Sequence, residues 1–375
     1  MQRRIVIAPD SFKGTATATE VAHAIAAGWQ RGRPGDQCIL PPMADGGEGT
    51  IDALETAASG STRVTTTVHG PLGKPGEASL LLLRDDTWVV ELAETSGIGL
   101  LDAVTRESAR AATTYGLGEA IRFAIDRGAQ RVLVALGSSA STDGGVGALM
   151  ALGARFLDES DAPIPLGNEG LHRLARVDLS PVGALPPDGI IALTDVTNPL
   201  LGPTGAAAVF GPQKGAAPED IAVLEAGLRR LVDILQISGA RADSPGAGAA
   251  GGTAFGLLAI GASIEPGALA IAEAIDLSRQ LARADLVITG EGSFDAQSLA
   301  GKVPSAVLEI AAVHDVPVAV IAGRVSPDAL NGDTGTHPAS MLSLSELAGS
   351  AEATMSDPVR WLEVAGEQAA GLFNG

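Results

Sequence analysis

The sequence predicts an α/β protein made of two domains with largely parallel sheets. Strand-like and helix-like runs alternate along the chain, which is the order that parallel β-α-β units produce. The 375 residues exceed the size at which a single core usually stops growing, about 250–300 residues. Ala, Leu, Val and Ile must build the cores, because the chain has only 3 Trp, 1 Tyr and 7 Phe. Aliphatic cores of this kind suit helices packed on parallel sheets.

The chain begins with a β-α-β-α-β pattern. The apolar run 4–9 predicts a buried strand, and Thr17 with Glu20 forms a capping box that opens a helix running to about residue 30. The segments that complete this first stretch are a short strand at 37–41, a helix that ends near residue 58, and a strand at 64–68.

A different strand pattern follows the turn-rich stretch 70–76, and this change places the first domain boundary. Two apolar runs, 79–84 and 87–91, are separated by Asp85 and Asp86, which predicts a β-hairpin. The later elements are expected in this order: helix 107–128, strand 131–136, a helix from 146, strand 190–194, helices up to 281, strand 285–289, a helix from 304, strand 317–322 and a terminal helix 361–372.

The charge and composition exclude several classes of protein. A formal net charge of −19 makes nucleic acid and anionic membrane surfaces poor partners. The one cysteine, Cys38, excludes a disulfide within the chain, and its apolar neighbours predict a buried, inert thiol. The N-terminal segment has no signal-peptide pattern, and no apolar run reaches the ~18 residues of a membrane span. We therefore expect a cytoplasmic protein.

The lysines carry the first functional signal. Only four lysines stand beside 21 arginines, and each of the four has a glycine neighbour. Lysine is a compact charge and a common phosphate binder that arginine does not replace, and glycine loops let backbone N–H groups approach a phosphate. The pattern indicates a phosphate-handling enzyme, whereas for Lys74 and Lys214 simple tolerance at a loop tip is the main alternative. The four are Lys13, Lys74, Lys214 and Lys302.

Carboxylates in glycine-rich loops directly after strands are the second signal. In open α/β sheets ligands bind outside the carboxyl ends of the strands, where a carboxylate can hold Mg²⁺, orient a hydroxyl or take its proton. Together with the lysines they predict phosphoryl transfer. For any single position, a helix cap or Asx-turn is the competing interpretation. The positions are Asp10, Asp45, Glu48, Asp143, Asp195, Glu291 and Asp295.

Standard nucleotide and hydrolase signatures are weak or missing. The chain has no Gly-x-x-x-x-Gly-Lys-Ser/Thr loop and no Gly-x-Ser-x-Gly elbow. The segment 246–251 matches Gly-x-Gly-x-x-Gly, but no strand pattern precedes it. An NAD-dependent hydroxy-acid reductase is therefore only a weak alternative.

Eight motifs, in this order and spacing, resemble the type I glycerate kinase family. The chain departs from that pattern at Ser293, where similar proteins often carry Arg, and at Thr142, where they often carry Asn. The motifs are Ala8-Pro-Asp-Ser-Phe-Lys-Gly14, Pro42-Met-Ala-Asp-Gly-Gly-Glu-Gly-Thr50, Glu94-Thr-Ser-Gly-Ile-Gly-Leu100, Gly137-Ser-Ser-Ala-Ser-Thr-Asp-Gly-Gly145, Thr194-Asp-Val-Thr-Asn-Pro-Leu200, Gly248-Ala-Ala-Gly-Gly252, Thr289-Gly-Glu-Gly-Ser-Phe-Asp295 and Gly301-Lys-Val-Pro304.

The resemblance implies ATP-dependent phosphorylation of (R)-glycerate, assisted by Mg²⁺. It also implies two α/β domains with the active-site cleft between them: a discontinuous flavodoxin/Rossmann-like domain with a parallel sheet, residues 1–75 plus 270–375, and a second domain, residues 76–269. We expect 2-phosphoglycerate as the product, with 3-phosphoglycerate as the alternative. A non-catalytic sensor of small hydroxy acids is the alternative from another class. Glycerate and ATP are the expected partners, without nucleic acid or membrane, and a homodimer is the candidate assembly.

Roles follow from these motifs as expectations. Lys13 and Lys302 are expected to neutralise phosphoryl or carboxylate oxygens. Asp195 is the expected base for the substrate hydroxyl, with Asp143 as the second candidate. The other expected site residues are Asp10, Ser11, Asp45 and Glu48 for the substrate, Gly46, Gly47, Ser138, Ser139, Gly144, Gly145, Gly251 and Gly252 for phosphate or ATP, and Glu291 and Asp295 for the metal.

Overall fold

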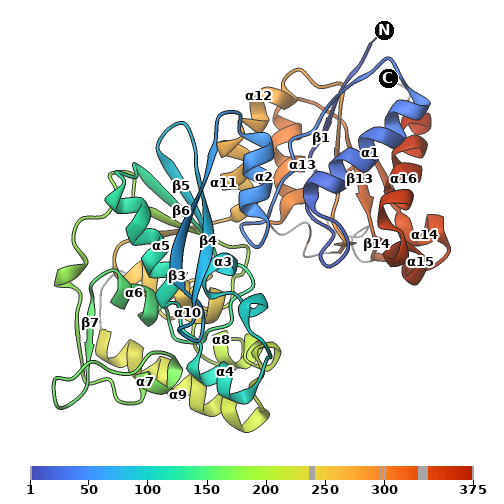
Figure 1. Ribbon diagram of the computed structural model, residues 1–375. Helices are drawn as coiled ribbons and strands as arrows, with labels where there is room; N and C mark the ends of the chain where they lie inside the picture. The colour runs from blue at the N-terminus through green and yellow to red at the C-terminus, as the bar shows by residue number, and fades with distance from the viewer. Residues whose placement is uncertain (1, 236–240, 296–297, 299–300, 328–336, 374–375) are drawn as a thin grey trace. The chain divides into compact units, whose positions relative to one another are not determined.

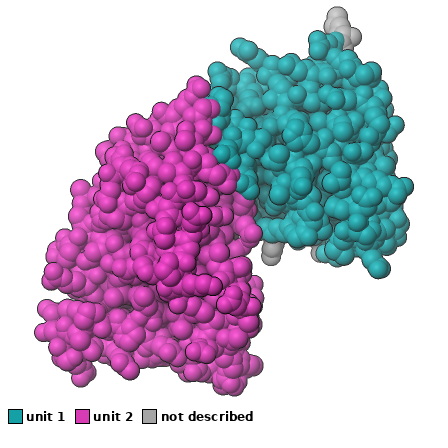
Figure 2. Space-filling model, in the orientation of Figure 1, with its two compact units in different colours: residues 1–45, 52–59, 266–375 teal, residues 46–51, 60–265 magenta. Residues whose placement is uncertain are grey.

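The computed structural model describes residues 2–235, 241–295, 298, 301–327 and 337–373 (Figure 1). The chain divides into two units, coloured separately in Figure 2. The first comprises residues 1–45, 52–59 and 266–375, and the second comprises residues 46–51 and 60–265. Each unit contains its own sheet with helices, so the predicted mixed α/β class is confirmed.

In its described residues, the first unit is built on a sheet of five parallel strands. Across the sheet they are β15 (Ser340–Ser343), β13 (Val318–Ala322), β11 (Leu286–Thr289), β1 (Arg4–Ile7) and β2 (Gln37–Ile39). Numbered within the unit, this is the flavodoxin-like order 2-1-3-4-5. The order reverses between β1 and β11, where ligands of such sheets usually bind.

Helices and one small ladder complete this unit. The ladder pairs β12 (Ser293–Phe294) with β14 (Arg324–Val325) in parallel. The helices are α1 (Ala18–Gly32), α2 (Thr50–Ala57), whose first two residues belong to the second unit, α11 (Gly267–Ala274), α12 (Leu277–Leu281), α13 (Val303–Val313), α14 (Leu344–Ala348), α15 (Ala351–Ser356) and α16 (Pro358–Leu372). The predicted capping box opens α1, because Thr17 and Glu20 bond each other's backbone N–H groups.

The two ends of the chain meet where α1 and α16 pack side by side (Figure 1). Glycines allow this close approach: a Cβ atom at Gly28 would lie 1.9 Å from the carbonyl oxygen of Glu363. A Cβ atom at Gly366 would lie 2.3 Å from the carbonyl oxygen of Ile25. Substitution at either position would therefore force the helices apart.

The described part of the second unit has a mixed sheet of six strands. Across the sheet they are β10 (Ser263–Glu265), β9 (Ile190–Leu193), β6 (Arg131–Ala135), β5 (Thr87–Glu91), β4 (Pro75–Leu82) and β3 (Thr62–His69). The first four are parallel, and β4 runs antiparallel to both β5 and β3, as the predicted hairpin requires. Because β3 pairs with β4 along its whole length, residues 60–75, which we expected in the first domain, lie in the second unit.

One predicted helix of the second unit is wrong. Residues 107–128 form two helices, α4 (Arg106–Ala111) and α5 (Tyr115–Asp126). The helix breaks between them because the backbone N–H of Thr114 and the hydroxyls of Thr113 and Thr114 donate to the carboxylate of Asp143. The other elements are α3 (Leu92–Ser96), α6 (Val146–Ala151), β7 (Arg155–Leu157), α7 (Asn168–Leu171), β8 (Arg176–Asp178), α8 (Ala206–Phe210), α9 (Pro218–Leu235) and α10 (Ala249–Ala259), with 3₁₀ turns at Ile98–Leu100, Ser180–Val182 and Pro212–Lys214.

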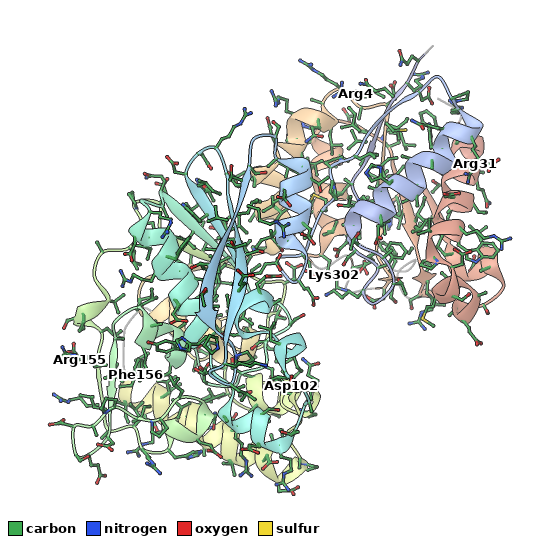
Figure 3. All side chains as sticks on the ribbon, viewed as in Figure 1. Arg4, Arg31, Asp102, Arg155, Phe156 and Lys302 are labelled. Atoms are coloured by element: carbon green, nitrogen blue, oxygen red, sulfur yellow. The ribbon has the colours of Figure 1, made fainter. Side chains whose placement is uncertain are left out.

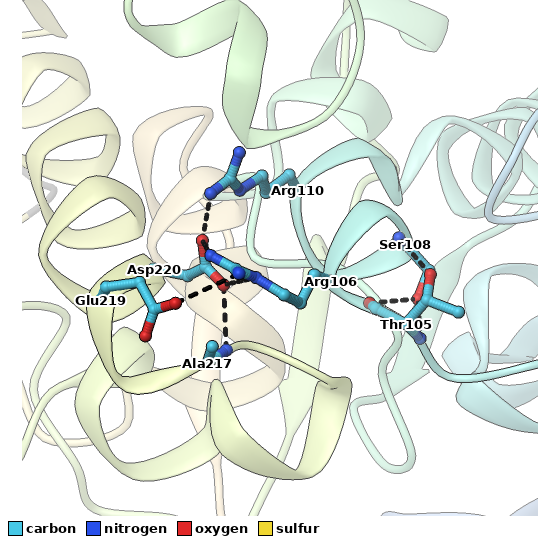
Figure 4. A network of polar contacts seen from close by, with 7 residues as sticks. All are labelled: Thr105, Arg106, Ser108, Arg110, Ala217, Glu219 and Asp220. Atoms are coloured by element: carbon cyan, nitrogen blue, oxygen red, sulfur yellow. Dashed lines mark hydrogen bonds and ion pairs between the residues drawn. The ribbon is translucent and has the colours of Figure 1, made fainter.

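An ionic network around one buried carboxylate ties α4 to α9 (Figure 4). Asp220, fully buried in the first turn of α9, accepts a hydrogen bond from Arg106 Nε at 2.7 Å and pairs with Arg110. Its Oδ2 also accepts from the backbone N–H of Ala217 at 2.9 Å. These donors hold the pKa of Asp220 below its usual range. The network fixes the segment before α9, which carries Lys214.

Two further sequence expectations concern the single cysteine and membrane-spanning helices. Cys38 is half-buried, and burial raises the pKa of its thiol to about 11, so the thiol is unreactive at neutral pH. Within the described parts of the chain, none of the helices is both long and apolar enough to cross a bilayer.

Candidate active site

A cavity of about 500 Å³ lies in the first unit, where the loops after β1 and β11 come together. This is the point at which the strand order of the sheet reverses, the usual ligand position in this topology. Among the described residues, four carboxylates and three cations line it. They are Asp10, Asp45, Glu291 and Asp295, and Lys13, Lys302 and Arg324.

Asp10 is the most perturbed group of this cavity. Its backbone N–H donates to the carbonyl oxygen of Gly290 at 2.8 Å, and its Oδ1 accepts from the N–H of Ser11 at 2.6 Å. The side chain is buried, which raises its pKa to about 7, and the nearby charge of Asp45 acts in the same direction. A carboxyl group with a pKa near neutrality can both accept and release a proton.

The two predicted catalytic lysines both lie in this cavity, each beside a carboxylate. Lys13 Nζ lies 3.2 Å from Asp45 Oδ2, which raises the pKa of the lysine. Lys302, labelled in Figure 3, precedes α13, and its Nζ lies 3.4 Å from Glu291 Oε2. The structure therefore brings together the loops at residues 10–13, 45, 291 and 302, which are distant in sequence.

Glu291 and Asp295 are the residues expected to hold a metal. Glu291 is buried, which raises its pKa, and its Oε1 accepts no hydrogen bond from a described residue. Asp295 Oδ1 accepts from the N–H of Ser298 at 3.3 Å and so caps a turn at the cavity wall. No group of three or more metal-ligand side chains is preformed among the described residues. Mg²⁺ commonly takes one or two carboxylates plus phosphate and water, so an unbonded Glu291 oxygen fits that ion.

Asp45 and Glu48, expected to act together, belong to different units. Asp45 pairs with Lys13 in the first unit, whereas Glu48 Oε2 accepts from Ser138 Oγ at 2.7 Å in the second. The segment containing Glu48 closely approaches the loop of residues 137–145, named here the serine loop. A Cβ atom at Gly137 would lie 2.5 Å from the Cα atom of Gly47. The loop of residues 45–50 thus contributes to both units.

Lys214 is not a loop-tip lysine. It is 2% exposed, and its Nζ donates to the carbonyl oxygen of Ser141 and to Ser139 Oγ at 3.4 Å. Burial lowers its pKa to about 7. No carboxylate of the described residues lies within 4.0 Å of its ammonium group. The sequence placed this residue among glycines but carried no sign of its burial.

Asp143 also lies inside the second unit. It is fully buried, and besides the threonine donors it accepts from the N–H groups of Gly145 and Gly147 at 3.1 and 3.2 Å. This geometry suits a brace for the serine loop rather than a base that meets substrate. Gly251 lies against the same loop, because a Cβ atom there would be 2.0 Å from the carbonyl oxygen of Ser141.

The predicted phosphate-binding residues of the second unit gather at one edge of its sheet. Gly144 N–H donates to the carbonyl oxygen of Gly251 at 3.1 Å. Ala250, Gly251 and Gly252 have φ angles of 52°, 67° and 87° in succession, an uncommon left-handed turn. Asp195 lies two residues after the end of β9, and the serine loop follows the neighbouring parallel strand β6, so both leave the sheet at the same edge.

Two further outcomes concern residues that the motifs misjudged or missed. The Gly-x-Gly-x-x-Gly match at 246–251 follows a turn and not a strand, unlike a dinucleotide fingerprint. Arg324, absent from the expected site, lines the cavity of the first unit. Its only sequence signal was a position two residues after the strand at 318–322.

Comparison with known proteins identifies the family. Residues 5–374 match the model of the glycerate kinase family. A glycerate kinase of Bacillus subtilis is 42% identical over 330 residues, covering 87% of this chain and 86% of that protein. A glycerate 2-kinase of Escherichia coli is 39% identical over 330 residues, covering 87% and 86%.

A solved structure supports the same grouping. The crystal structure of a Salmonella typhimurium LT2 protein assigned as glycerate kinase 2 superposes with a TM-score of 0.83 at 36% identity. The match covers 99% of this chain and 98% of that one. With a family model over nearly its whole length and relatives near 40% identity, the chain belongs to the glycerate kinase family and is an enzyme of that kinase class.

Proposed function

We propose that the protein transfers the γ-phosphoryl group of ATP to (R)-glycerate and forms 2-phosphoglycerate. The observation that carries this proposal is the cavity at the strand-order reversal, where a buried carboxyl with a pKa of about 7 lies among lysines and further carboxylates. Phosphoryl transfer needs a positioned hydroxyl, a group that takes its proton, and cations around the phosphoryl oxygens. The name of the Escherichia coli relative supports position 2.

Asp10 is our first candidate for the base. Its carboxylate takes the proton of the substrate hydroxyl as that oxygen forms its bond to the γ-phosphorus, the bond from the γ-phosphorus to the bridging oxygen breaks, and ADP leaves. Burial raises its proton affinity into the range that suits this task. Asp195, the base expected from the motifs, is the competing candidate from the second unit, and Asp143 ranks below both because its oxygens are already bonded inside the fold.

The lysines supply the positive charge that a protein of net charge −19 must concentrate at one place. Lys13 and Lys302 are each held by a carboxylate, which keeps an ammonium group at the cavity wall. Glu291, with Asp295 nearby in the lining, would hold Mg²⁺. When bound, that ion supplies charge neutralisation at the phosphate oxygens.

The first experiment incubates the protein with ATP, Mg²⁺ and (R)-glycerate and follows the product by ³¹P NMR against authentic 2- and 3-phosphoglycerate. A signal that matches 2-phosphoglycerate supports the proposal, and one that matches 3-phosphoglycerate corrects the position. Intact ATP in a folded sample would favour a hydroxy-acid sensor. A homodimer and a cytoplasmic location stay predictions from the sequence.

The identity of the base is tested by comparing Asp10→Asn with Asp195→Asn. We expect the first variant to lose about 10²–10⁴-fold in kcat, the usual contribution of a general base. If Asp195→Asn loses that much and Asp10→Asn less than tenfold, with both folded, then Asp195 is the base and Asp10 only orients the substrate.

A further inference from the structure

The two-stranded ladder β12–β14 places an arginine at the cavity wall. Ser293 and Arg324 are direct partners in this parallel ladder, and both line the cavity. Partners in a parallel ladder point to the same face of the sheet, about 4.8 Å apart. Arg324 therefore enters the cavity from the strand beside the loop that carries Glu291.

Backbone hydrogen bonds and close packing fix the main chain at Arg324. Arg324 N–H donates to the carbonyl oxygen of Gly292 at 3.1 Å, and Gly323 N–H donates to that of Glu291 at the same distance. The two segments pack so closely that a Cβ atom at Gly323 would lie 2.4 Å from the oxygen of Gly292. A Cβ atom at Gly290 would lie 1.8 Å from the carbonyl oxygen of Ile321. The position of Arg324 is thus set by rigid ladder geometry.

The cations that line the cavity differ in whether they form an ion pair with a protein carboxylate. Lys13 lies 3.2 Å from Asp45, and Lys302 lies 3.4 Å from Glu291. Arg324 is exposed and forms no ion pair with another described residue. Among the described cations that line the cavity, it is therefore the one whose charge is not already countered by a protein carboxylate.

We propose that Arg324 binds the carboxylate of the three-carbon hydroxy acid and so determines that the acceptor must be an acid. The proposal rests on the proposed function. A guanidinium group offers a planar fork that matches a carboxylate with two parallel hydrogen bonds, which an ammonium group cannot do. The cavity's carboxylates suit the substrate's hydroxyls, whereas they would repel its carboxylate without such a cation.

The test compares glycerate with its neutral amide, glyceramide, in the wild type and in Arg324→Gln. A hydrogen-bonded charged group commonly contributes about 1.5–3 kcal/mol, so we expect kcat/KM for glycerate to fall about 10- to 100-fold. The KM for ATP and the kcat/KM for glyceramide should stay within about threefold. Arg324→Lys should recover only part of the loss, because lysine keeps the charge but loses the fork. Arg283→Gln, an exposed arginine of the same unit outside the cavity lining, is the matched control.

Two results would overturn this inference. An equal loss of kcat/KM for glycerate and glyceramide in Arg324→Gln would mean that Arg324 does not bind the substrate carboxylate. A raised KM for ATP with an unchanged KM for glycerate would assign Arg324 to the nucleotide. If the wild type does not turn over ATP, the proposed function fails on its own. Calorimetric titration of glycerate into wild type and Arg324→Gln then decides the inference, since equal affinities would exclude it.

Discussion

Asp10 in the first unit and Lys214 in the second are both buried, and burial brings the pKa of each to about 7 from opposite directions. Burial disfavours the charged form of either group, so the acid's pKa rises and the base's pKa falls. The surroundings differ. Asp10 lines a cavity of about 500 Å³, whereas Lys214 donates to a loop carbonyl inside the fold. The same effect of burial thus accompanies a candidate base in one unit and an internal brace in the other.

The comparison also separates three of the four lysines, which look alike in sequence. Lys13 is exposed beside Asp45, Lys302 is half-buried beside Glu291, and Lys214 is buried among neutral oxygens. The neighbouring glycines, Gly14, Gly73, Gly215 and Gly301, share a positive φ, so they mark turns of the backbone. The surroundings of each lysine side chain decide its use.

The largest expected effect is that of replacing Asp10, the buried acid of the first unit. Asp10→Asn should lower kcat by about 10²–10⁴-fold and should also change stability with pH. The folded pKa is raised from 3.8 to about 7, so the native state binds more protons in that range and loses stability as pH rises through it. The variant should therefore be more stable than the wild type above pH 7 and nearly equal below pH 4, measured by urea unfolding.

One outcome would contradict the prediction for Asp10→Asn. If wild type and Asp10→Asn show the same dependence of unfolding free energy on pH between 4 and 7, then Asp10 is not perturbed and is a poor candidate for the base. Ser345→Ala, a change outside the cavity lining, serves as the control for general effects.

The second expected effect compares glycines in the loops of the two units. Gly251→Ala should destabilise the protein by roughly 3 kcal/mol or more, because the new Cβ atom would lie 2.0 Å from the carbonyl oxygen of Ser141. Gly14→Ala has a similar φ of 79° but nothing within 4 Å, so only the left-handed backbone costs energy, about 1–2 kcal/mol. Thermal unfolding of both variants decides this, and equal losses would show that packing around Lys214 is loose.

The third effect concerns Lys214 itself. Its folded pKa is lowered from 10.5 to about 7, so the unfolded state binds more protons in that window and stability rises with pH through it. Lys214→Met should remove this rise, and hydrogen exchange of the second unit at pH 7 and 9 would measure it. An unchanged rise in the variant would assign the pH dependence to another group.

The smallest effect is expected at Lys13. Lys13→Arg keeps the charge and the pairing with Asp45 but replaces a compact ammonium by a wider fork. We expect about a tenfold lower kcat, against no change for Lys74→Arg, since Lys74 is exposed and lies outside the cavity. Full turnover by Lys13→Arg would disprove the idea that a compact cation is needed there.

Local patterns predicted the elements well, and their failures have physical causes. Thr17 and Glu20 marked a helix start because a cap is a local interaction. The break in the helix near residue 112 was missed because Asp143, some thirty residues later, takes the donors of Thr113 and Thr114. Long-range hydrogen bonds of this kind leave no periodic signal.

For the candidate site, the sequence predicted those residues of the cavity lining that lie in loops at strand ends. Asp10, Lys13 and Glu291 come from motifs that follow strands, and the parallel sheet brings those loops together. Arg324 was missed because its neighbour Ser293 lies thirty-one residues earlier, and their pairing depends on the register of two short strands. Lys214 was misjudged because burial is a property of the packed unit.

The packing of α1 against α16 has a consequence for folding during synthesis on the ribosome. The core of the first unit needs β1 beside β11 and α1 beside α16, so it cannot close until the final helix has been synthesised. The second unit ends at residue 265, and its strands are all available more than a hundred residues earlier. Domains generally fold as units in the order of synthesis. The inserted unit can therefore fold before β11 and α16, which complete the first unit, have been synthesised.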